Sequence, residues 1–260
     1  MAERAAALLL LLAVAAAPVG AAPAISIIID DLGDRAGDAA VLALPPAVAL
    51  SVLPHTPYGA HLARAGTTRG HEVLLHLPME PAGSQAPGPG VLTADLDRAA
   101  FLARLWGDLA TVPGARGVNN HMGSRLTRQP EQMRWVMTAL RARGDLFFVD
   151  SRTTHETVAF QVAGDFGLRR AERDRFLDNV VERGAIRAEL LGLVEEARVT
   201  GTALAIGHPH PATLAVLAEM LPQLDALGVE LVPVSELIER RADAGRLRVT
   251  ALPPAAGDAE

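Results

Sequence analysis

Short apolar runs alternate with segments of helical periodicity along this sequence, and that alternation constrains the fold more than any other feature. The runs lie at residues 24–30, 47–54, 73–75, 115–124, 145–151, 202–208 and 229–235. Apolar runs of this kind form buried strands, and strands that alternate with helices form parallel sheets. The pattern predicts an α/β protein, either a (β/α) barrel of about seven parallel strands or an open doubly wound sheet.

Composition narrows the class of protein. The chain has 260 residues, half of them hydrophobic, which is enough for one large core. Its net charge of −6, without a basic stripe, gives no electrostatic footprint for nucleic acid. Aromatic residues make up only 3% of the chain, which counts against a deep groove that stacks sugars on aromatic faces.

The amino terminus has the pattern of a secretory signal peptide. Arg4 precedes an apolar run at 5–17, and small residues follow up to Ala22. The run is short for a bilayer span, so we expect cleavage rather than an uncleaved membrane anchor. The mature protein is then expected in the periplasm or cell envelope, without a stable membrane span and, lacking cysteine, without disulfides. We expect three segments: a signal peptide at 1–22, one domain at 23–245 and a flexible tail at 246–260.

Polar side chains end most of the apolar runs. The first run ends on Asp30 and Asp31, and the third carries His76 with Glu80 four residues later. Because the carboxyl ends of parallel strands converge on one face, these groups are expected to meet there. Imidazole and carboxylate groups are ligands of divalent metals, so the pattern predicts a metal site. Further candidates end later runs: Asn119, Asn120, His121, Asp150, Ser151, Arg152 and His208.

Five segments together resemble the divergent polysaccharide deacetylases, which are distant relatives of the NodB-type carbohydrate esterases. The segments are IDDLG, GHEVLLHLPME, NNHMGSRLT, FFVDSRTT and AIGHPHP, in that order. The resemblance covers residues 24–240, nearly the whole mature chain. It implies a distorted barrel of about seven strands with its site at the carboxyl-terminal mouth.

The resemblance also implies roles for individual residues. Asp30 matches the family's catalytic base, and His208 matches its general acid. Asp31 and His76 match ligands of a divalent metal, with zinc expected. The family's second metal-binding histidine is replaced by Glu80, which could ligate zinc; His121, at the end of the neighbouring strand, is the alternative third ligand.

The function implied is the metal-dependent removal of N-acetyl groups from an envelope polysaccharide such as peptidoglycan. Asn119 or Asn120 could steady the oxyanion. Asp150 and Arg152 are the remaining candidates for substrate contacts, with Arg152 suited to a carboxylate such as the lactyl group of a muramic sugar.

Two alternatives stay open on the sequence alone. The first is a degenerate, non-catalytic deacetylase fold that binds glycan or a protein partner. It is favoured by the missing second histidine and by NNHMGS standing where the family carries an Arg-x-Pro motif. The second is another metal-assisted hydrolysis on the same scaffold, because a fold does not determine its reaction.

Overall fold

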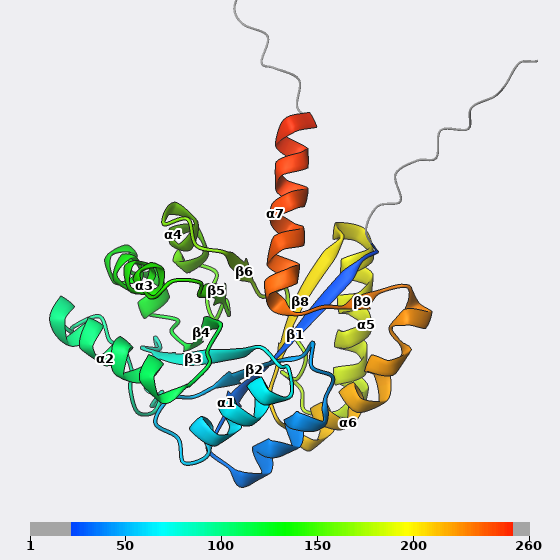
Figure 1. Ribbon diagram of the computed structural model, residues 1–260, viewed down its shortest axis with the longest axis horizontal. Coiled ribbons are helices and arrows are strands. Elements are labelled where there is room, and N and C mark those ends of the chain that lie inside the picture. Colours follow the sequence, from blue (N-terminus) through cyan, green and yellow to red (C-terminus); the bar gives the residue numbers. More distant parts are fainter. Residues whose placement is uncertain (1–21, 252–260) are drawn as a thin grey trace, which may run out of the picture.

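In residues 22–251, which the computed structural model describes, nine strands form one parallel sheet that curls around a central axis (Figure 1). Every neighbouring pair of strands is parallel. The strands are β1 (Ala24–Leu32), β2 (Ala49–Val52), β3 (Val73–Met79), β4 (Gly117–Met122), β5 (Phe147–Asp150), β6 (Arg170–Glu172), β7 (Arg175–Phe176), β8 (Thr202–Gly207) and β9 (Glu230–Leu231).

One short segment joins the two edges of the sheet. The strand order is β6-β5-β4-β3-β2-β1-β8-β7, so the edge strands β6 and β7 are neighbours in the chain, separated only by Arg173 and Asp174. Residues 170–176 therefore pair with β5 through their first part and with β8 through their second. The strand order contains eight strands. Because β6 and β7 belong to one continuous segment that fills a single place in the barrel, the barrel has seven strand positions around its axis. The distorted barrel is confirmed over the open sheet.

Two parts of the chain differ from the expected strands. Residues 170–176, RAERDRF, are too polar to resemble a buried strand in the sequence, yet they close the barrel. The run at 229–235 was expected to be a full strand, but β9 pairs with β1 only at Ala24 and Ile25. The chain then enters a helix at Val234.

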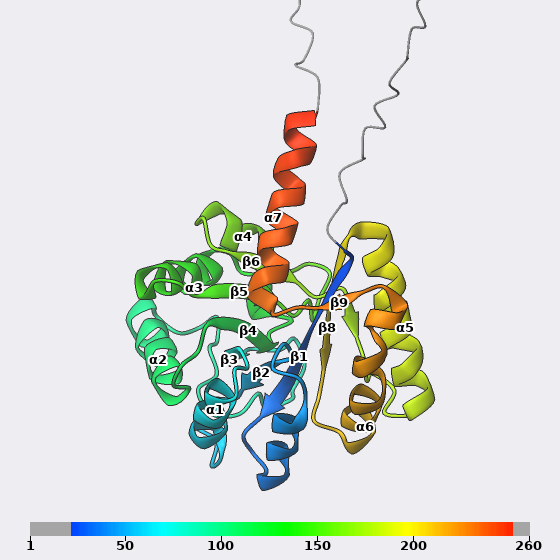
Figure 2. The same cartoon turned by 45° about the vertical axis from the view of Figure 1, so that its right-hand side comes forward.

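Helices surround the outside of the sheet, and the last of them packs over its amino-terminal end (Figure 2). The helices are η1 (Ala36–Ala43), α1 (Gly59–Thr68), α2 (Arg98–Thr111), η2 (Leu126–Arg128), α3 (Pro130–Arg143), α4 (Ala159–Asp165), α5 (Arg183–Thr200), α6 (Pro211–Met220), η3 (Leu221–Gln223), η4 (Asp225–Leu227) and α7 (Val234–Ala251). None of the helices in the described part of the chain is long and apolar enough to cross a bilayer.

The last helix runs further than the expected domain boundary. Residues 246–251 continue α7 although the tail was expected to begin at 246. The remainder of that tail, 252–260, lies outside the described residues, as do residues 1–21 of the expected signal peptide.

Alternation along the strands separates two apolar layers. On β1, Ile25, Ile27 and Ile29 belong to the large cluster between sheet and helices, whereas Ile28 belongs to a smaller cluster inside the barrel. Side chains of a strand alternate between the two faces of the sheet. A residue two positions beyond an interior apolar residue therefore faces the interior too, at the carboxyl-terminal mouth. This rule positions most of the site.

Candidate metal centre

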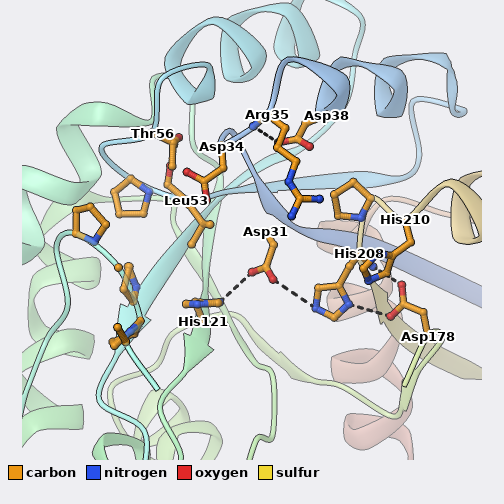
Figure 3. A pocket seen from close by; sticks show the side chains of 17 residues that line it. Asp31, Asp34, Arg35, Asp38, Leu53, Thr56, His121, Asp178, His208 and His210 are labelled. Atoms are coloured by element: carbon orange, nitrogen blue, oxygen red, sulfur yellow. Dashed lines mark hydrogen bonds and ion pairs between the residues drawn. The ribbon is translucent and has the colours of Figure 1, made fainter. Parts of the chain in front are cut away.

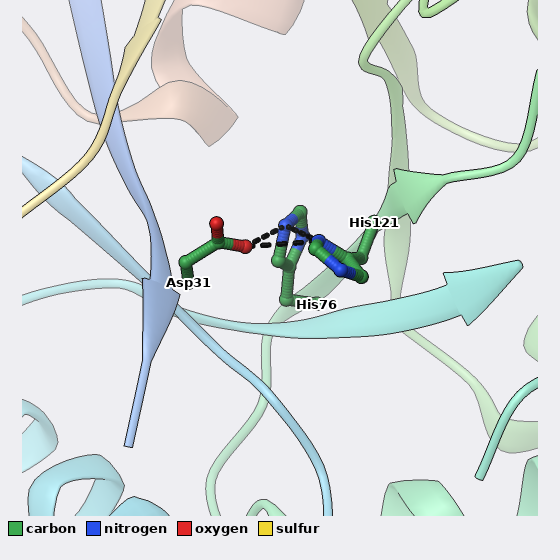
Figure 4. A group of neighbouring side chains, drawn as sticks. All are labelled: Asp31, His76 and His121. Atoms are coloured by element: carbon green, nitrogen blue, oxygen red, sulfur yellow. Dashed lines mark hydrogen bonds and ion pairs between the residues drawn. The ribbon is translucent and has the colours of Figure 1, made fainter. Parts of the chain in front are cut away.

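Three side chains from β1, β3 and β4 meet at the carboxyl-terminal mouth of the barrel (Figure 4). Asp31 Oδ1 lies 3.1 Å from His76 Nε2 and 2.9 Å from His121 Nδ1. The two imidazole nitrogens lie 3.2 Å from each other. We call Asp31, His76 and His121 the metal-type cluster.

The metal-type cluster fits a divalent cation. Ligands about 2.1 Å from a tetrahedral ion lie about 3.4 Å from one another, close to the spacing found here. Asp31 Oδ1 is buried without a hydrogen bond of good geometry, although two imidazole nitrogens are near it. Such an oxygen needs a proton or a cation between it and those nitrogens. Three protein ligands also leave a coordination position open, as catalytic zinc sites do.

A break in the alternation lets two consecutive carboxylates reach this mouth. Asp30 faces the interior because it lies two residues beyond Ile28. Asp31 would face outward, but the pairing of β1 with β2 shifts register between Ile29 and Leu32, and Asp31 has a φ of 58°. Bulges and left-handed residues re-aim side chains next to active sites.

Asn119 determines which nitrogen of His76 is available to a metal. Asn119 Oδ1 accepts hydrogen bonds from the Ser51 hydroxyl, at 2.6 Å, and from His76 Nδ1, at 3.0 Å. Because Nδ1 donates its proton, neutral His76 keeps its lone pair on Nε2, toward Asp31 and His121.

The same amide also holds Asp30. Asn119 Nδ2 donates to both carboxylate oxygens of Asp30, at 2.9 and 3.1 Å. Asp30 Oδ2 lies 3.5 Å from His76 Nε2, so Asp30 borders the metal-type cluster without belonging to it. Asn119 therefore fixes the spacing between Asp30 and His76.

His208 lies on the other side of the Asp31 carboxylate from His121 (Figure 3), and Asp178 orients its ring. Asp178 Oδ1 lies 2.8 Å from His208 Nδ1, and its Oδ2 accepts the backbone N–H of His208 and the hydroxyl of Thr213. His208 Nε2 then points toward Asp31, 3.9 Å from Oδ2. Burial lowers the pKa of His208, but the hydrogen bond to Asp178 and the charges of Asp30, Asp178 and Asp31 raise it to about 9.

The electrostatics of the metal-type cluster favour positive charge within it. Burial raises the pKa of Asp31, yet the neighbouring imidazoles of His121 and His76 lower it far below its usual range. Burial likewise lowers the pKa of His76, but Asp30 and Asp31 raise it above its ordinary value. A divalent ion would supply the positive charge that these shifts indicate.

A cavity of about 460 Å³ opens over these groups (Figure 3). Asp31, His121 and His208 form part of its wall. Residues 86–89, within the Pro/Gly-rich loop after β3, also line it. The metal-type cluster can therefore be reached from outside the protein through this cavity.

Glu80 is not near the metal-type cluster. Its carboxylate accepts the backbone N–H of Ala94 and pairs with Arg125 at 2.9 Å. Because β3 stays extended to Met79, residues four apart along it are separated by about 13 Å. His121 reaches His76 instead, since β4 pairs beside β3 with Asn119 opposite His76. Of the two expected third ligands, the structure brings only His121 to the site.

Three of the four expected substrate contacts are buried in the protein. Asn119 is fully buried, with both ends of its amide used as described above. Asn120 faces away from the barrel interior, and its amide bonds the backbone of Met122 and Ser151. Asp150 is fully buried and accepts hydrogen bonds around the start of α4, including from Thr157. Strand alternation places Asn120 and Asp150 on the outer face, so these positions do not fit substrate contacts.

Arg152 is partly exposed but is paired within the protein. Its guanidinium lies 3.5 Å from a carboxylate oxygen of Glu172, and it does not line the cavity. The expected contact with a substrate carboxylate therefore does not fit this position either.

Asp178 and Ser51 were not predicted as functional residues. Asp178 lies just after the carboxyl end of β7, as the other site residues lie at the ends of their strands. However, β7 is only two residues long. Ser51 lies two residues beyond the interior Ala49 in the run at 47–54, so the alternation rule could have found it. A two-residue strand has no periodicity, so the sequence gives no local signal for Asp178.

Comparison with known proteins identifies the family. A family model described as divergent polysaccharide deacetylase matches residues 27–238. The chain belongs to this family. Among its relatives, the uncharacterized protein YibQ of Escherichia coli K12 is 37% identical over 233 residues, covering 89% of this chain and 72% of YibQ.

Solved structures are similar to this protein in fold. The uncharacterized protein ATU2773 of Agrobacterium tumefaciens superposes with a TM-score of 0.79 at 25% identity, covering 83% of this chain and 89% of that one. Peptidoglycan deacetylase PdaC of Bacillus subtilis gives a TM-score of 0.53 at 12% identity, covering 89% of this chain and 98% of PdaC. At that identity, the likeness to PdaC concerns the fold alone.

Proposed function

We propose that this protein is a metal-dependent hydrolase that removes acetyl groups from an N-acetylated envelope polysaccharide, peptidoglycan being the favoured substrate. One observation carries the proposal. Asp31 Oδ1, His76 Nε2 and His121 Nδ1 lie within 3.2 Å of one another, and they are bordered by a buried carboxylate, Asp30, and by an aspartate-paired imidazole, His208. This set contains the groups that hydrolysis of an acetamide requires.

The metal-type cluster would hold the cation, and its two nitrogens and one oxygen suit zinc. A divalent ion there would polarise the acetamide carbonyl and lower the pKa of an attacking water. Membership of the polysaccharide deacetylase family, whose substrates are glycans, supports the choice of reaction. The substrate itself and the identity of the metal are part of the proposal.

Asp30 acts as the general base, and His208 acts as the general acid. Asp30, kept in place by Asn119, takes a proton from the attacking water. His208 keeps its proton on Nε2 when charged and donates it to the departing amine. Asp178 stabilises that charged form and fixes the ring toward Asp31.

The test measures acetate release. Protein stripped with a chelator and reloaded with zinc is incubated with N-acetylglucosamine oligomers and with peptidoglycan strands. We expect acetate only from the reloaded protein. Asp30→Asn should lower kcat by about 100- to 10,000-fold, the usual contribution of general base catalysis, while zinc still binds.

Asn119→Asp and Asp150→Asn serve as comparisons. Asn119→Asp places a second carboxylate against Asp30 and should impair turnover, whereas Asp150→Asn changes a carboxylate on the outer face and should retain it. Stoichiometric zinc without acetate from any N-acetylated glycan would overturn the deacetylase proposal. It would favour the non-catalytic alternative or another hydrolysis.

We also propose that the protein is exported to the periplasm or cell envelope. The support is the signal-peptide pattern of residues 1–22. Fractionation of cells, followed by amino-terminal sequencing, tests it. A mature chain that begins near Pro23 is expected, and an intact Met1 in the cytosolic fraction would contradict export.

A further inference from the structure

Arg35 lines the cavity above the metal-type cluster. Figure 3 shows its side chain extending from the start of η1 into the space bordered by Asp31, His208 and His210. Arg35 is exposed, and among residues 22–251 its guanidinium has no ion-pair partner. Arginines elsewhere in the described residues do pair with a carboxylate, as Arg125 does with Glu80 and Arg187 with Glu219.

The backbone turn that carries Asp31 also presents Arg35. The buried carboxylate of Asp38 accepts the backbone N–H groups of Gly33, at 2.9 Å, and Arg35, at 3.1 Å. Gly33 has a φ of 119°, and a Cβ atom there would lie 2.3 Å from the Thr56 hydroxyl. These contacts determine the turn, so the backbone of Arg35 is held at a fixed place relative to Asp31.

Arg35 is the one fixed positive charge among the described residues that line the cavity, and the chain contains no lysine. The acidic groups of the wall are occupied or face elsewhere. Asp38 bonds the turn, and Asp178 bonds His208. Asp34 points to the side of Leu53 and Thr56, away from the Arg35 guanidinium (Figure 3).

We propose that Arg35 binds a carboxylate on the substrate, so that the site prefers N-acetylated glycans with an acidic group near the scissile acetamide. This inference rests on the proposed function. A guanidinium presents parallel N–H donors that match a carboxylate in a bidentate pair. His210, which also lines this side of the cavity, offers a further nitrogen to the same group. Arg35 takes the role that Arg152, paired with Glu172, does not fit.

The experiment compares glycans that differ in their carboxylate. Zinc-loaded wild type and Arg35→Gln are given neutral N-acetylglucosamine oligomers and peptide-free strands that contain N-acetylmuramic acid with its lactyl carboxylate. For wild type we expect kcat/KM to be higher on the acidic strands. Arg35→Gln should reduce the acidic-to-neutral ratio by about tenfold, through KM, because hydrogen bonds between charged groups contribute on that scale. Hyaluronan oligomers carry their carboxylate on a uronate sugar, so they show whether Arg35 prefers a uronate carboxylate or the lactyl carboxylate of N-acetylmuramic acid.

Arg98→Gln is the matched control. Arg98 is exposed at the start of α2 and lies outside the cavity lining, so this variant loses the same charge and should keep the wild-type ratio. No preference of wild type for acidic glycans, or a preference that survives Arg35→Gln, would overturn the inference and leave the deacetylase proposal standing.

A binding measurement keeps the inference testable if no glycan releases acetate. Calorimetry would then compare both glycans on wild type and Arg35→Gln at low and high salt. Tighter binding of the acidic glycan that Arg35→Gln and salt both weaken supports the Arg35 contact in a non-catalytic site. Equal binding of the two glycans contradicts it.

Discussion

Residues in the left-handed backbone region gather where strands leave the barrel. In residues 22–251 the non-glycine members of this group are Asp31, His55, Met122 and Arg152, with φ between 49° and 58°. All four lie at or just after the carboxyl ends of β1, β2, β4 and β5. Such residues cost on the order of 1–3 kcal/mol each and persist where the surrounding structure holds them. Asp31 shows what the strain achieves, since it turns a second carboxylate into the site.

The third ligand can be decided at the level of single residues. His121→Ala should weaken zinc binding by more than the roughly 10- to 100-fold that loss of a supporting hydrogen bond costs. Glu80→Gln should leave the affinity unchanged, because Glu80 bonds Ala94 and Arg125 instead. Competition with a chromophoric chelator measures both. The opposite order of effects would return the ligand role to Glu80.

The Asp178–His208 pair predicts a pH dependence in the metal-free protein. The pKa of His208 is raised from an ordinary 6.5 to about 9 in the folded state. Its protonation therefore stabilises the fold fully below pH 6.5, and this contribution is lost as the pH rises through 9.

Asp178→Asn should lower the pKa of His208 toward its ordinary value, because the charged hydrogen-bond acceptor is gone. The loss of stability should then occur at lower pH. NMR titration of the His208 ring and urea denaturation across pH 5–10 measure the two effects. An unchanged pKa in the variant would mean that Asp178 does not support the charged ring.

At the scale of elements, α7 closes the amino-terminal end of the barrel. Val234, Leu237 and Ile238 from its first turns belong to the interior cluster, together with Ala24 at the start of β1. The Ser26 hydroxyl bonds the carbonyl of Val232, just before this helix, at 2.6 Å. The amino-terminal end of the barrel interior is thus apolar and closed, while the polar site lies at the carboxyl-terminal mouth.

Shortening a buried side chain of α7 should therefore lower the stability of the whole protein. Leu237 is completely buried, so Leu237→Ala should lower the free energy of unfolding by about 2–5 kcal/mol. Leu191→Ala on α5 is the control, because Leu191 is 45% exposed and its loss should cost little. Urea denaturation compares them. Similar values for the two variants would contradict the role of α7 as the seal.

At the scale of the whole molecule, the metal-type cluster brings together side chains from distant parts of the sequence. Its three side chains come from β1, β3 and β4, and they converge only in the folded barrel. Binding that occurs only in the folded state adds to stability. The site and the stability of the fold are therefore linked.

Zinc should raise the unfolding temperature of the protein. At a free concentration 100 times its Kd, an ion raises the free energy of unfolding by about 2.7 kcal/mol. His76→Ala should abolish most of this gain, whereas His61→Ala, an exposed residue of α1, should retain it. Thermal denaturation with and without a chelator measures it. An undiminished gain in His76→Ala would mean that zinc binds elsewhere. Within the described residues, Asp178, His208 and His210 form a second group of suitable geometry.

Much of the candidate site follows from local pattern. Asp30, His76 and His208 each lie two residues beyond an interior apolar residue, namely Ile28, Leu74 and Ile206. An apolar run predicts its own strand, and the period of two predicts which side chains share a face. The choice between Glu80 and His121 had no such local signal, since it depends on which strands are neighbours and where each stops.

The sequence by itself determined the parallel α/β architecture, the strand ends that carry chemistry and the family, because these depend on periodicity and on motifs within single segments. Only the tertiary structure decided that the polar segment 170–176 closes the barrel, that Asp178 orients His208 and that Arg35 reaches over the metal-type cluster. Each of those relations joins parts of the chain that are brought side by side by the pairing of strands. That pairing is a property of the whole sheet, and no single segment encodes it.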